Sequence, residues 1–339
     1  MSTLRFLARE AVLLVLLLVM LVGAILFNQP EFLFPELAAL GLGSLVLLKR
    51  VWKVSKWRLV VLLSFASLLG TVLQLYSPCP FVVNMGIGFI GVGAMLILLR
   101  SSLYPALSAC LLPLVLDEGS WVYPVAVVVL SLLLVGAQGL SERLHWRAKL
   151  PFRPVETPVW RRFQRLGLLA VVVVVWSIGA YYSGHLYFVF PPLIVLFVEM
   201  ARPGTGLRKA PLRILLLIAV SALLGNLSIF VFVYTPLLNL VLSPIWALVR
   251  VLSVMIAIIL LLGVFSLSKR YFAPAMAIAL LPQLAYPDTW WQFPLEVTLS
   301  AALLIGVAYL LPSPKQPASL VSVQRSASAP TSLVNNPPR

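Results

Sequence analysis

Apolar residues in this chain form long blocks, and each block is followed by a short break that carries charges, prolines or glycines. The blocks approach the roughly 20 residues that an α-helix needs to cross about 30 Å of hydrocarbon. They do not alternate apolar and polar residues as the strands of a membrane barrel do. Only 10% of the 339 residues are charged and 61% are hydrophobic, whereas about a quarter are charged in an ordinary soluble domain. We therefore predict an all-α integral membrane protein.

Twelve apolar segments follow one another, and we predict that each connects the two faces of the membrane. They are residues 10–27, 32–48, 59–76, 80–99, 102–116, 121–140, 165–183, 186–201, 212–233, 244–267, 271–286 and 292–312. The fifth and eleventh are short, and each contains two prolines: Pro105 and Pro113 in one, Pro274 and Pro282 in the other. Because proline breaks or kinks a helix, we expect a short, proline-broken or kinked helix at the fifth place of each half, buried by its neighbours.

The basic residues predict the topology. If the N-terminus is inside, every Lys and Arg except Arg250 falls on the cytoplasmic side. The loops predicted on the other side hold acidic residues instead: Glu31, Asp117, Glu118 and Asp288. Such a bias is what the positive-inside rule describes. We predict a multi-pass protein of the cell inner membrane with both termini in the cytoplasm, and reporter tags at Gly119 or Thr289 on the outside.

Short motifs repeat between the two halves of the chain. The pairs are Phe34–Leu37 with Phe190–Leu193, Ala66–Gly70 with Ser221–Gly225, Tyr104–Ala106 with Ala273–Ala275, Leu111–Pro113 with Leu280–Pro282, and Trp121–Pro124 with Trp291–Pro294. The offset is larger for the late pairs, so the second half has gained residues near 234–246. Since six crossings are an even number, the two units are predicted to be parallel, and parallel repeats recur in transporters with the solute path between the halves.

These features divide the chain into four parts. Residues 1–140 form the first six-helix unit and residues 165–312 the second. Residues 141–164 form a basic cytoplasmic linker, which we expect to lie against anionic lipid headgroups. Residues 313–339, rich in Pro, Ser and Ala, are predicted to be a disordered cytoplasmic tail. Because the linker is not part of a folded basic surface, no nucleic-acid partner is predicted.

Two charged residues at membrane depth are candidates for a solute path. Arg250 lies inside the tenth segment, where a charge is costly and normally faces a cavity, a bundle interior or a partner. It binds an anion, or it snorkels to the outer headgroups. Glu199 lies near the cytoplasmic end of the eighth segment. It exchanges a proton during transport, or it pairs with Arg202, Arg208 or Lys209.

Polar amides and prolines complete the candidate set. Asn84 and Asn226 line a path or form hydrogen bonds between helices. The path walls are predicted from the short helices around Pro105, Pro113, Pro274 and Pro282, together with the second segment and the eighth, which begins at Pro191 and Pro192. The glycines of residues 86–91 match a dinucleotide fingerprint in letters only, since no strand precedes them. They are predicted to allow close helix packing.

No enzyme activity, metal or cofactor is predicted. His145 and His185 have no second histidine or carboxylate at metal-ligand spacing. Cys79 and Cys110 are too few and too far apart for a disulfide framework, and both are interpreted as packing residues.

The order of these motifs resembles a known family. A helix that opens at Phe190–Leu193 and closes at Glu199–Pro203 is followed by Arg213, by Ser221–Gly225 and by a short proline-containing helix. This order resembles the HPP family of integral membrane proteins, named after a His-Pro-Pro motif, some of whose members are described as nitrite transporters. At the place of that motif the chain has Leu103-Tyr104-Pro105 and Phe272-Ala273-Pro274. It resembles less closely the membrane domains of fusaric-acid-resistance and aromatic-acid exporters.

Both resemblances imply transport of a small, anionic solute. The first hypothesis is therefore a transporter or permease whose path lies between the two units. The second is a membrane scaffold or assembly subunit that transports nothing, and the third is a subunit of an aromatic-acid or drug exporter. The predicted partners are the lipid bilayer and the solute, and the sequence leaves a homo-oligomer open.

Overall fold

The fold is known from a computed structural model. It describes residues 2–311 except 50, 118, 150, 153, 203–204, 233–245, 286 and 288, and leaves out the side chains of residues 2, 3 and 246–248. The predicted tail and the acidic residues Glu118 and Asp288 lie outside the described residues. All regular structure in the described part is helical.

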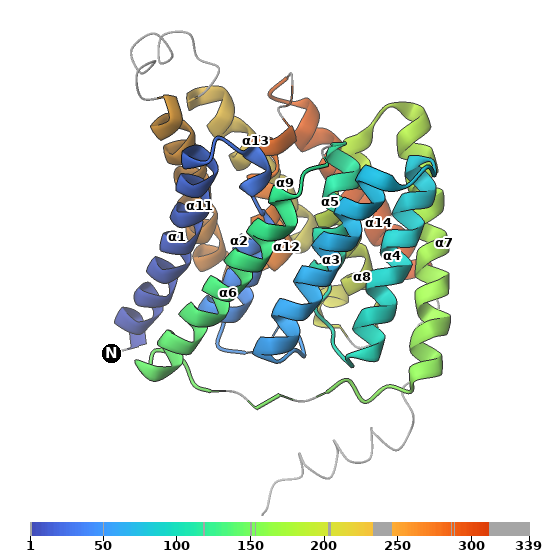
Figure 1. The fold of residues 1–339 in the computed structure, drawn as a ribbon. Helices are drawn as coiled ribbons and strands as arrows, with labels where there is room; N and C mark the ends of the chain where they lie inside the picture. Colours follow the sequence, from blue (N-terminus) through green and yellow to red (C-terminus); the bar gives the residue numbers. More distant parts are fainter. Residues whose placement is uncertain are drawn as a thin grey trace, which may run out of the picture.

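Eight helices in the described part are long and apolar enough to cross a membrane. They are α1 (Ser2–Leu26), α3 (Lys56–Tyr76), α4 (Phe81–Leu98), α6 (Val122–Arg143), α7 (Val159–Ser183), α9 (Pro211–Phe232), α11 (Trp246–Ser268) and α14 (Gln292–Leu310). Figure 1 shows them running between the same two ends of the molecule. Many of their large apolar side chains are exposed, as expected of residues that face lipid. The chain is thus an all-α, multi-pass membrane protein.

Four helical segments are short and lie among the long ones. They are α2 (Glu36–Gly41), which continues as the π-helical η2 (Leu42–Val46), α5 (Pro105–Leu116), α8 (Pro191–Ala201), and α12 (Ala273–Leu280) followed by α13 (Pro282–Ala285). Every residue of α2, α8 and α12 is buried, and only the last residue of α5 is not. Eleven or twelve residues of helix rise about 16–18 Å, roughly half of the hydrocarbon thickness. None of the four can cross a membrane alone.

In the second and eighth segments, the helix is shorter than the apolar stretch that contains it. Residues 32–48 and 186–201 are apolar throughout most of their length, yet the helices begin only at Glu36 and Pro191. Proline fixes the start of each, because it favours the first helical turn and restricts the residue before it. Upstream, Phe32 ends the short 3₁₀ helix η1 (Pro30–Phe32), and Leu186–Val189 form the 3₁₀ helix η3.

The two proline-containing segments differ from each other. In the eleventh, the helix breaks at Leu281 and restarts at Pro282. In the fifth, α5 continues through Pro113 to Leu116. The helix therefore breaks in the second of these segments, whereas in the first Pro113 lies inside a continuous helix.

The packing follows the same plan in each half. In the first, α3 contacts α4, α5 and α6, and in the second, α9 contacts α11, α12 and α14. Other contacts cross between the halves: α2 packs on α12, α8 on α5, α4 on α7 and α11 on α1. The short helices are therefore in contact with one another at the centre of the molecule.

Two glycines allow the closest of these approaches. A side-chain carbon at Gly70 in α3 would overlap the backbone carbonyl of Cys110 in α5. A side-chain carbon at Gly225 in α9 would overlap the backbone carbonyl of Ala279 in α12. Each long helix thus touches the backbone of a short one, and only glycine fits at these two positions.

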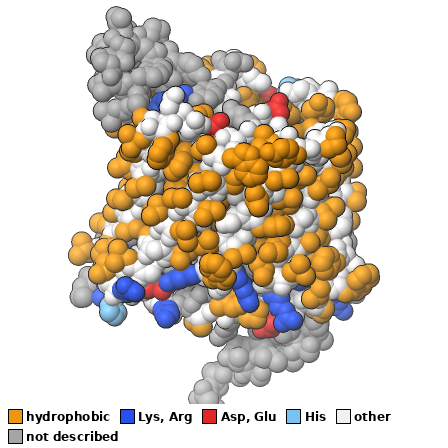
Figure 2. All heavy atoms as spheres, viewed as in Figure 1, with side chains coloured by type: hydrophobic (Ala, Val, Ile, Leu, Met, Phe, Trp, Pro, Cys, Tyr) orange, Lys and Arg blue, Asp and Glu red, His pale blue; other side chains and the backbone are white. Residues whose placement is uncertain are grey.

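Charged side chains separate the two faces. Figure 2 shows Lys and Arg along the face where α1 begins, below a broad belt of hydrophobic side chains. We call it the basic face. Contacts connect the helix ends there: the Arg162 guanidinium donates to the carbonyls of Leu96, Ile97 and Ser101 at 2.8–3.3 Å. Lys56 Nζ lies 2.7 Å from Glu142 Oε2. The segment between α6 and α7 crosses this face (Figure 1).

Candidate functional site

The most buried acidic side chain in the described residues is Glu36, which is 1% exposed. It is the first residue of α2, where Pro35 ends the preceding irregular stretch. A carboxylate at this position interacts favourably with the positive end of the helix dipole. The Ser108 hydroxyl, on α5, donates a hydrogen bond to Glu36 Oε1. Glu36 Oε2 is buried and has no hydrogen-bond partner among the described residues.

Contacts with α1 fix the depth of Glu36. The helix α2 runs antiparallel to α1: the backbone N–H of Phe34 donates to Met20 Sδ at 3.3 Å, and Arg9 Nη1 donates to the Val46 carbonyl at 2.9 Å. Met20 lies eleven residues beyond Arg9 in α1, which is about 16 Å of helix rise. Because Arg9 belongs to the basic face, Glu36 lies about halfway across the hydrocarbon.

The helix α5 begins beside Glu36 and runs the other way. Ser108 lies in its first turn, so α2 and α5 begin at similar depth. Beyond its end, the Gln74 side chain at the end of α3 donates to Asp117 Oδ1 at 2.6 Å. The helix α2 therefore leads from mid-membrane to the basic face, and α5 leads from mid-membrane to the opposite face.

Contacts with α14 give the depth of α8 in the second half. The Ser300 hydroxyl of α14 donates to the Phe188 carbonyl, just before α8, at 2.7 Å. Near the end of α8, Arg208 donates to the carbonyls of Met200 and Ala308. Ser300 and Ala308 are eight residues apart in α14, about 12 Å along the helix. The helix α8 thus also begins inside the membrane, but Pro192 stands where the motif Phe34–Leu37 has Glu36.

Glu199 is the second buried carboxyl group, near the end of α8. Its hydrogen-bond donor is Trp52 Nε1 at 3.0 Å from Oε1. Arg208, one of the predicted ion-pair partners, contacts backbone carbonyls instead. The Trp52 ring packs on the backbone of Gly43, where a side chain would overlap it. This contact joins the first half of the chain to the second at the basic face.

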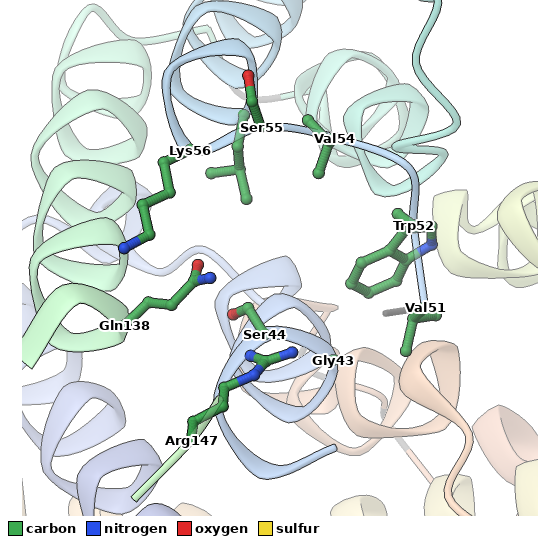
Figure 3. Close-up of a pocket in the computed structure, with 10 residues that line it drawn as sticks. Gly43, Ser44, Val51, Trp52, Val54, Ser55, Lys56, Gln138 and Arg147 are labelled. Atoms are coloured by element: carbon green, nitrogen blue, oxygen red, sulfur yellow. The ribbon is translucent and has the colours of Figure 1, made fainter. Parts of the chain in front are cut away.

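Trp52 also borders a small depression on the basic face. Figure 3 shows Lys56, Gln138, Arg147 and Ser44 around it. Its volume is about 40 Å³, room for little more than a water molecule. A second depression of about 270 Å³ lies between α9 and the start of α12, with Arg213, Arg270 and Tyr271 in its wall. Neither contains Glu36 or Ser108.

The other predicted polar residues lie away from this centre. Arg250 is half-buried in the first turns of α11, beside the segment 233–245 that the structure does not describe. Asn84 accepts a hydrogen bond from Ser77 at 2.7 Å and donates to the Cys79 carbonyl at 3.2 Å. Asn226 donates to the Trp290 carbonyl at 2.7 Å. Both asparagines connect a long helix to a turn.

All six predicted prolines lie in the short helices, and all are buried. They are Pro105 and Pro113 in α5, Pro191 and Pro192 in α8, Pro274 in α12 and Pro282 in α13. Pro105, Pro191 and Pro274 lie in first turns, where the missing N–H is not needed for a helical hydrogen bond. They determine where the short helices begin.

A third buried carboxyl group, Glu296 in α14, was not predicted. His185 Nδ1 lies 2.9 Å from Glu296 Oε1, and Gln292 Nε2 donates to the same oxygen at 3.1 Å. The described residues contain no group of three or more His, Cys, Asp or Glu side chains that could hold a metal ion.

One sequence signal was present for both unpredicted carboxylates. Glu36 and Glu296 each lie inside an apolar segment, 32–48 and 292–312, and each is the only acidic residue of its segment. Acidic residues in membrane-spanning segments are functional candidates by default. In the sequence, Glu36 also forms part of the repeated motif Phe34–Leu37.

No known family model, curated protein or solved structure matches this chain. The resemblance to the HPP family and to aromatic-acid exporters therefore stays a prediction based on sequence motifs. The chemistry of the site has to be inferred from its own geometry.

Proposed function

We propose that this protein is a transporter for a small, anionic solute, which passes between the two halves where α2, α5, α8 and α12 meet. One observation carries the proposal: these four helices are buried in the membrane part and too short to cross it. Irregular backbone at membrane depth is tolerated only where it is buried in protein or lines a water-filled cavity. Transporters build solute sites from such discontinuous helices.

The helix ends favour an anion at the centre. The N-terminus of a helix carries a partial positive charge of about half a unit. The helices α2 and α5 both begin at mid-membrane, beside Glu36 and Ser108, so their positive ends converge there. At the basic face, a high density of Lys and Arg raises the local concentration of anions.

We propose further that the chain crosses the membrane twelve times as two parallel six-helix units. The matching contacts of α3 and α9 support this arrangement. So do the two glycine contacts, because Gly70 and Gly225 are equivalent in the repeated motifs, and Cys110 and Ala279 directly precede the equivalent Leu111 and Leu280. By the positive-inside rule, the basic face would be the cytoplasmic face of the inner membrane.

The linker is proposed to contact anionic headgroups. Its residue Val155 donates a backbone hydrogen bond to the Arg100 carbonyl at 3.0 Å, and the Arg58 guanidinium lies 4.4 Å from the centre of the Phe152 ring. These contacts hold the linker along the basic face, where Lys and Arg side chains attract anionic lipid.

A membrane scaffold without transport is the second candidate. The observation that favours it is that neither of the two surface depressions contains Glu36 or Ser108. A scaffold requires no path, and buried short helices are compatible with a purely structural core.

An uptake screen separates the two. The purified protein is reconstituted into liposomes, and uptake of labelled nitrate, nitrite, formate and aromatic acids is compared with that into protein-free liposomes. A transporter accumulates at least one of these solutes above the control. Inactivity toward all of them, together with a stable partner that co-purifies with the protein, would favour the scaffold.

A further inference from the structure

Glu36 combines three features that a purely structural side chain does not require. It lies about halfway across the membrane, where the two short helices α2 and α5 meet. It is fully buried, and its Oε1 accepts a hydrogen bond from the Ser108 hydroxyl. Its other oxygen has no hydrogen-bond partner in the described part of the chain. An isolated carboxylate is strongly destabilised in such surroundings.

The elements packed on α2 supply no positive charge at this depth. The residues of α1 beyond Glu10 are uncharged, and α12 contains only Ala, Pro, Met, Ile and Leu. The helix α5 contributes Ser108 and the thiol of Cys110, and α6 contributes Tyr123, which donates to the Ala109 carbonyl at 2.9 Å. Glu31 in η1 is acidic, and Arg9 binds the far end of η2. No cation on the described elements that pack on α2 faces Glu36, which favours a mobile neutralising group such as a proton.

The proposed alignment of the halves gives an independent argument. Pro192 takes the place of Glu36, and Ala277 takes the place of Ser108. The second half packs equally tightly there, since every residue of α8 and α12 is buried. Packing of the short helices thus needs neither the carboxyl group nor the hydroxyl group. Their presence in one half alone indicates a chemical role.

We propose that Glu36 is the proton-binding site of the transport path, an inference that rests on the proposed function. A proton from one side of the membrane binds the free oxygen Oε2 and gives the neutral acid, with Ser108 still bonded to Oε1. The same proton leaves toward the other side and restores the carboxylate. The neutral form removes the negative charge from the centre, where the converging helix ends then attract the anionic solute.

The direct test is infrared difference spectroscopy of the purified, lipid-reconstituted protein as the pH is raised from about 5 to about 9, a range that spans known buried carboxyl groups. The carbonyl stretch of a protonated carboxylic acid is followed. We expect a band that disappears with rising pH in the native chain and is missing from Glu36→Gln. A Glu36 band of constant intensity over the whole range, or no band assignable to Glu36, would overturn the proposal.

Ser108→Ala provides a test that keeps the carboxyl group, in case Glu36→Gln does not fold. The hydroxyl bond stabilises the charged form, so its loss should move the midpoint of the titration upward by about one pH unit. Ser67→Ala is the matched control, because the buried Ser67 hydroxyl donates to the Ser64 carbonyl of its own helix at 3.2 Å. An unchanged midpoint in Ser108→Ala, or an equal shift in both variants, argues against the site.

Coupling is tested in liposomes with labelled nitrate, whose conjugate acid is too strong to carry protons across the bilayer by itself. An imposed proton gradient should drive nitrate accumulation by the native protein, and Glu36→Gln should lose this dependence. An equal response in Glu36→Gln would overturn the coupling. If no anion is taken up at all, the proposed function fails, whereas the infrared titration still decides whether Glu36 binds a proton.

Discussion

The first half of the chain places a carboxyl and a hydroxyl group where its two short helices cross, and the second half places only apolar side chains on α12 and at the start of α8. Both halves share the glycine contact between a long and a short helix. The shared features are those that pack the fold, and the difference lies in groups that packing does not need. The second half therefore serves as an internal control for the first.

The largest effect on stability is expected at the glycine contact that both halves share. Gly70→Leu and Gly225→Leu each drive a side chain into a backbone carbonyl that cannot move aside. Overpacking of this kind costs about 1–3 kcal/mol or more, so we expect loss of the monodisperse protein in size-exclusion chromatography for both variants.

Gly136→Leu and Gly263→Leu are the controls, because no atom lies within 4 Å of a side-chain carbon at either position. They should elute like the native protein. If Gly225→Leu is tolerated and Gly70→Leu is not, the two halves do not share their packing, and the comparison fails.

The second prediction concerns the difference between the halves. Ser108→Ala leaves Glu36 Oε1 without its donor, and an unsatisfied buried polar group costs about 1–3 kcal/mol. Ala277→Ser adds a hydroxyl at the equivalent place, where it can bond to its own helix. Its cost should be about 0.5 kcal/mol. Unfolding in mixed micelles, followed by tryptophan fluorescence, measures both, and equal losses would refute the assignment of a special role to Ser108.

The sequence predicted the membrane class well, because repeated runs of about twenty apolar residues are typical of helices that cross a bilayer. It did not predict that residues 32–48 and 186–201 form short helices. Hydropathy gives the length of an apolar stretch but not the residue at which its helix begins. Pro35 and Pro191 set that position here. Upstream residues such as Phe34, Val189 and Phe190 are buried by protein and do not continue a helix.

The site was predicted less well than the fold. The prolines were found, since their chemistry is local. Glu36 and Ser108 are 72 positions apart, and the sequence gives no sign that they meet. Glu199 was predicted as a site residue, but its hydrogen bond with Trp52, 147 positions away, was not. Contacts between residues this far apart in the chain depend on how the helices pack in three dimensions. The spacing of motifs in the sequence does not give this packing.

The third prediction concerns the contacts that hold the helix ends together at the basic face. In the second half, Arg208 donates to the carbonyls at the ends of α8 and α14 and lies 5.4 Å from the centre of the Tyr309 ring. Hydrogen bonds from a charged donor are stronger than neutral ones, so Arg208→Gln should cost about 1.5–3 kcal/mol. Arg213→Gln, in the same region but exposed, should be nearly neutral. A smaller loss for Arg208→Gln than for Arg213→Gln would contradict this.

The smallest effect on stability is expected at the contact between helix ends at the basic face of the first half. There, Lys56 pairs with Glu142 at 2.7 Å, and the Lys56 side chain is 36% exposed. Exposed ion pairs contribute about 0.2–1 kcal/mol and are screened by salt, so Lys56→Gln should lower stability slightly at low ionic strength and not at all in high salt. Melting temperatures at two salt concentrations measure this, with Lys149→Gln as the control for net charge. A loss as large as that of Arg208→Gln, and independent of salt, would mean that the first half is held at the basic face by more than this pair.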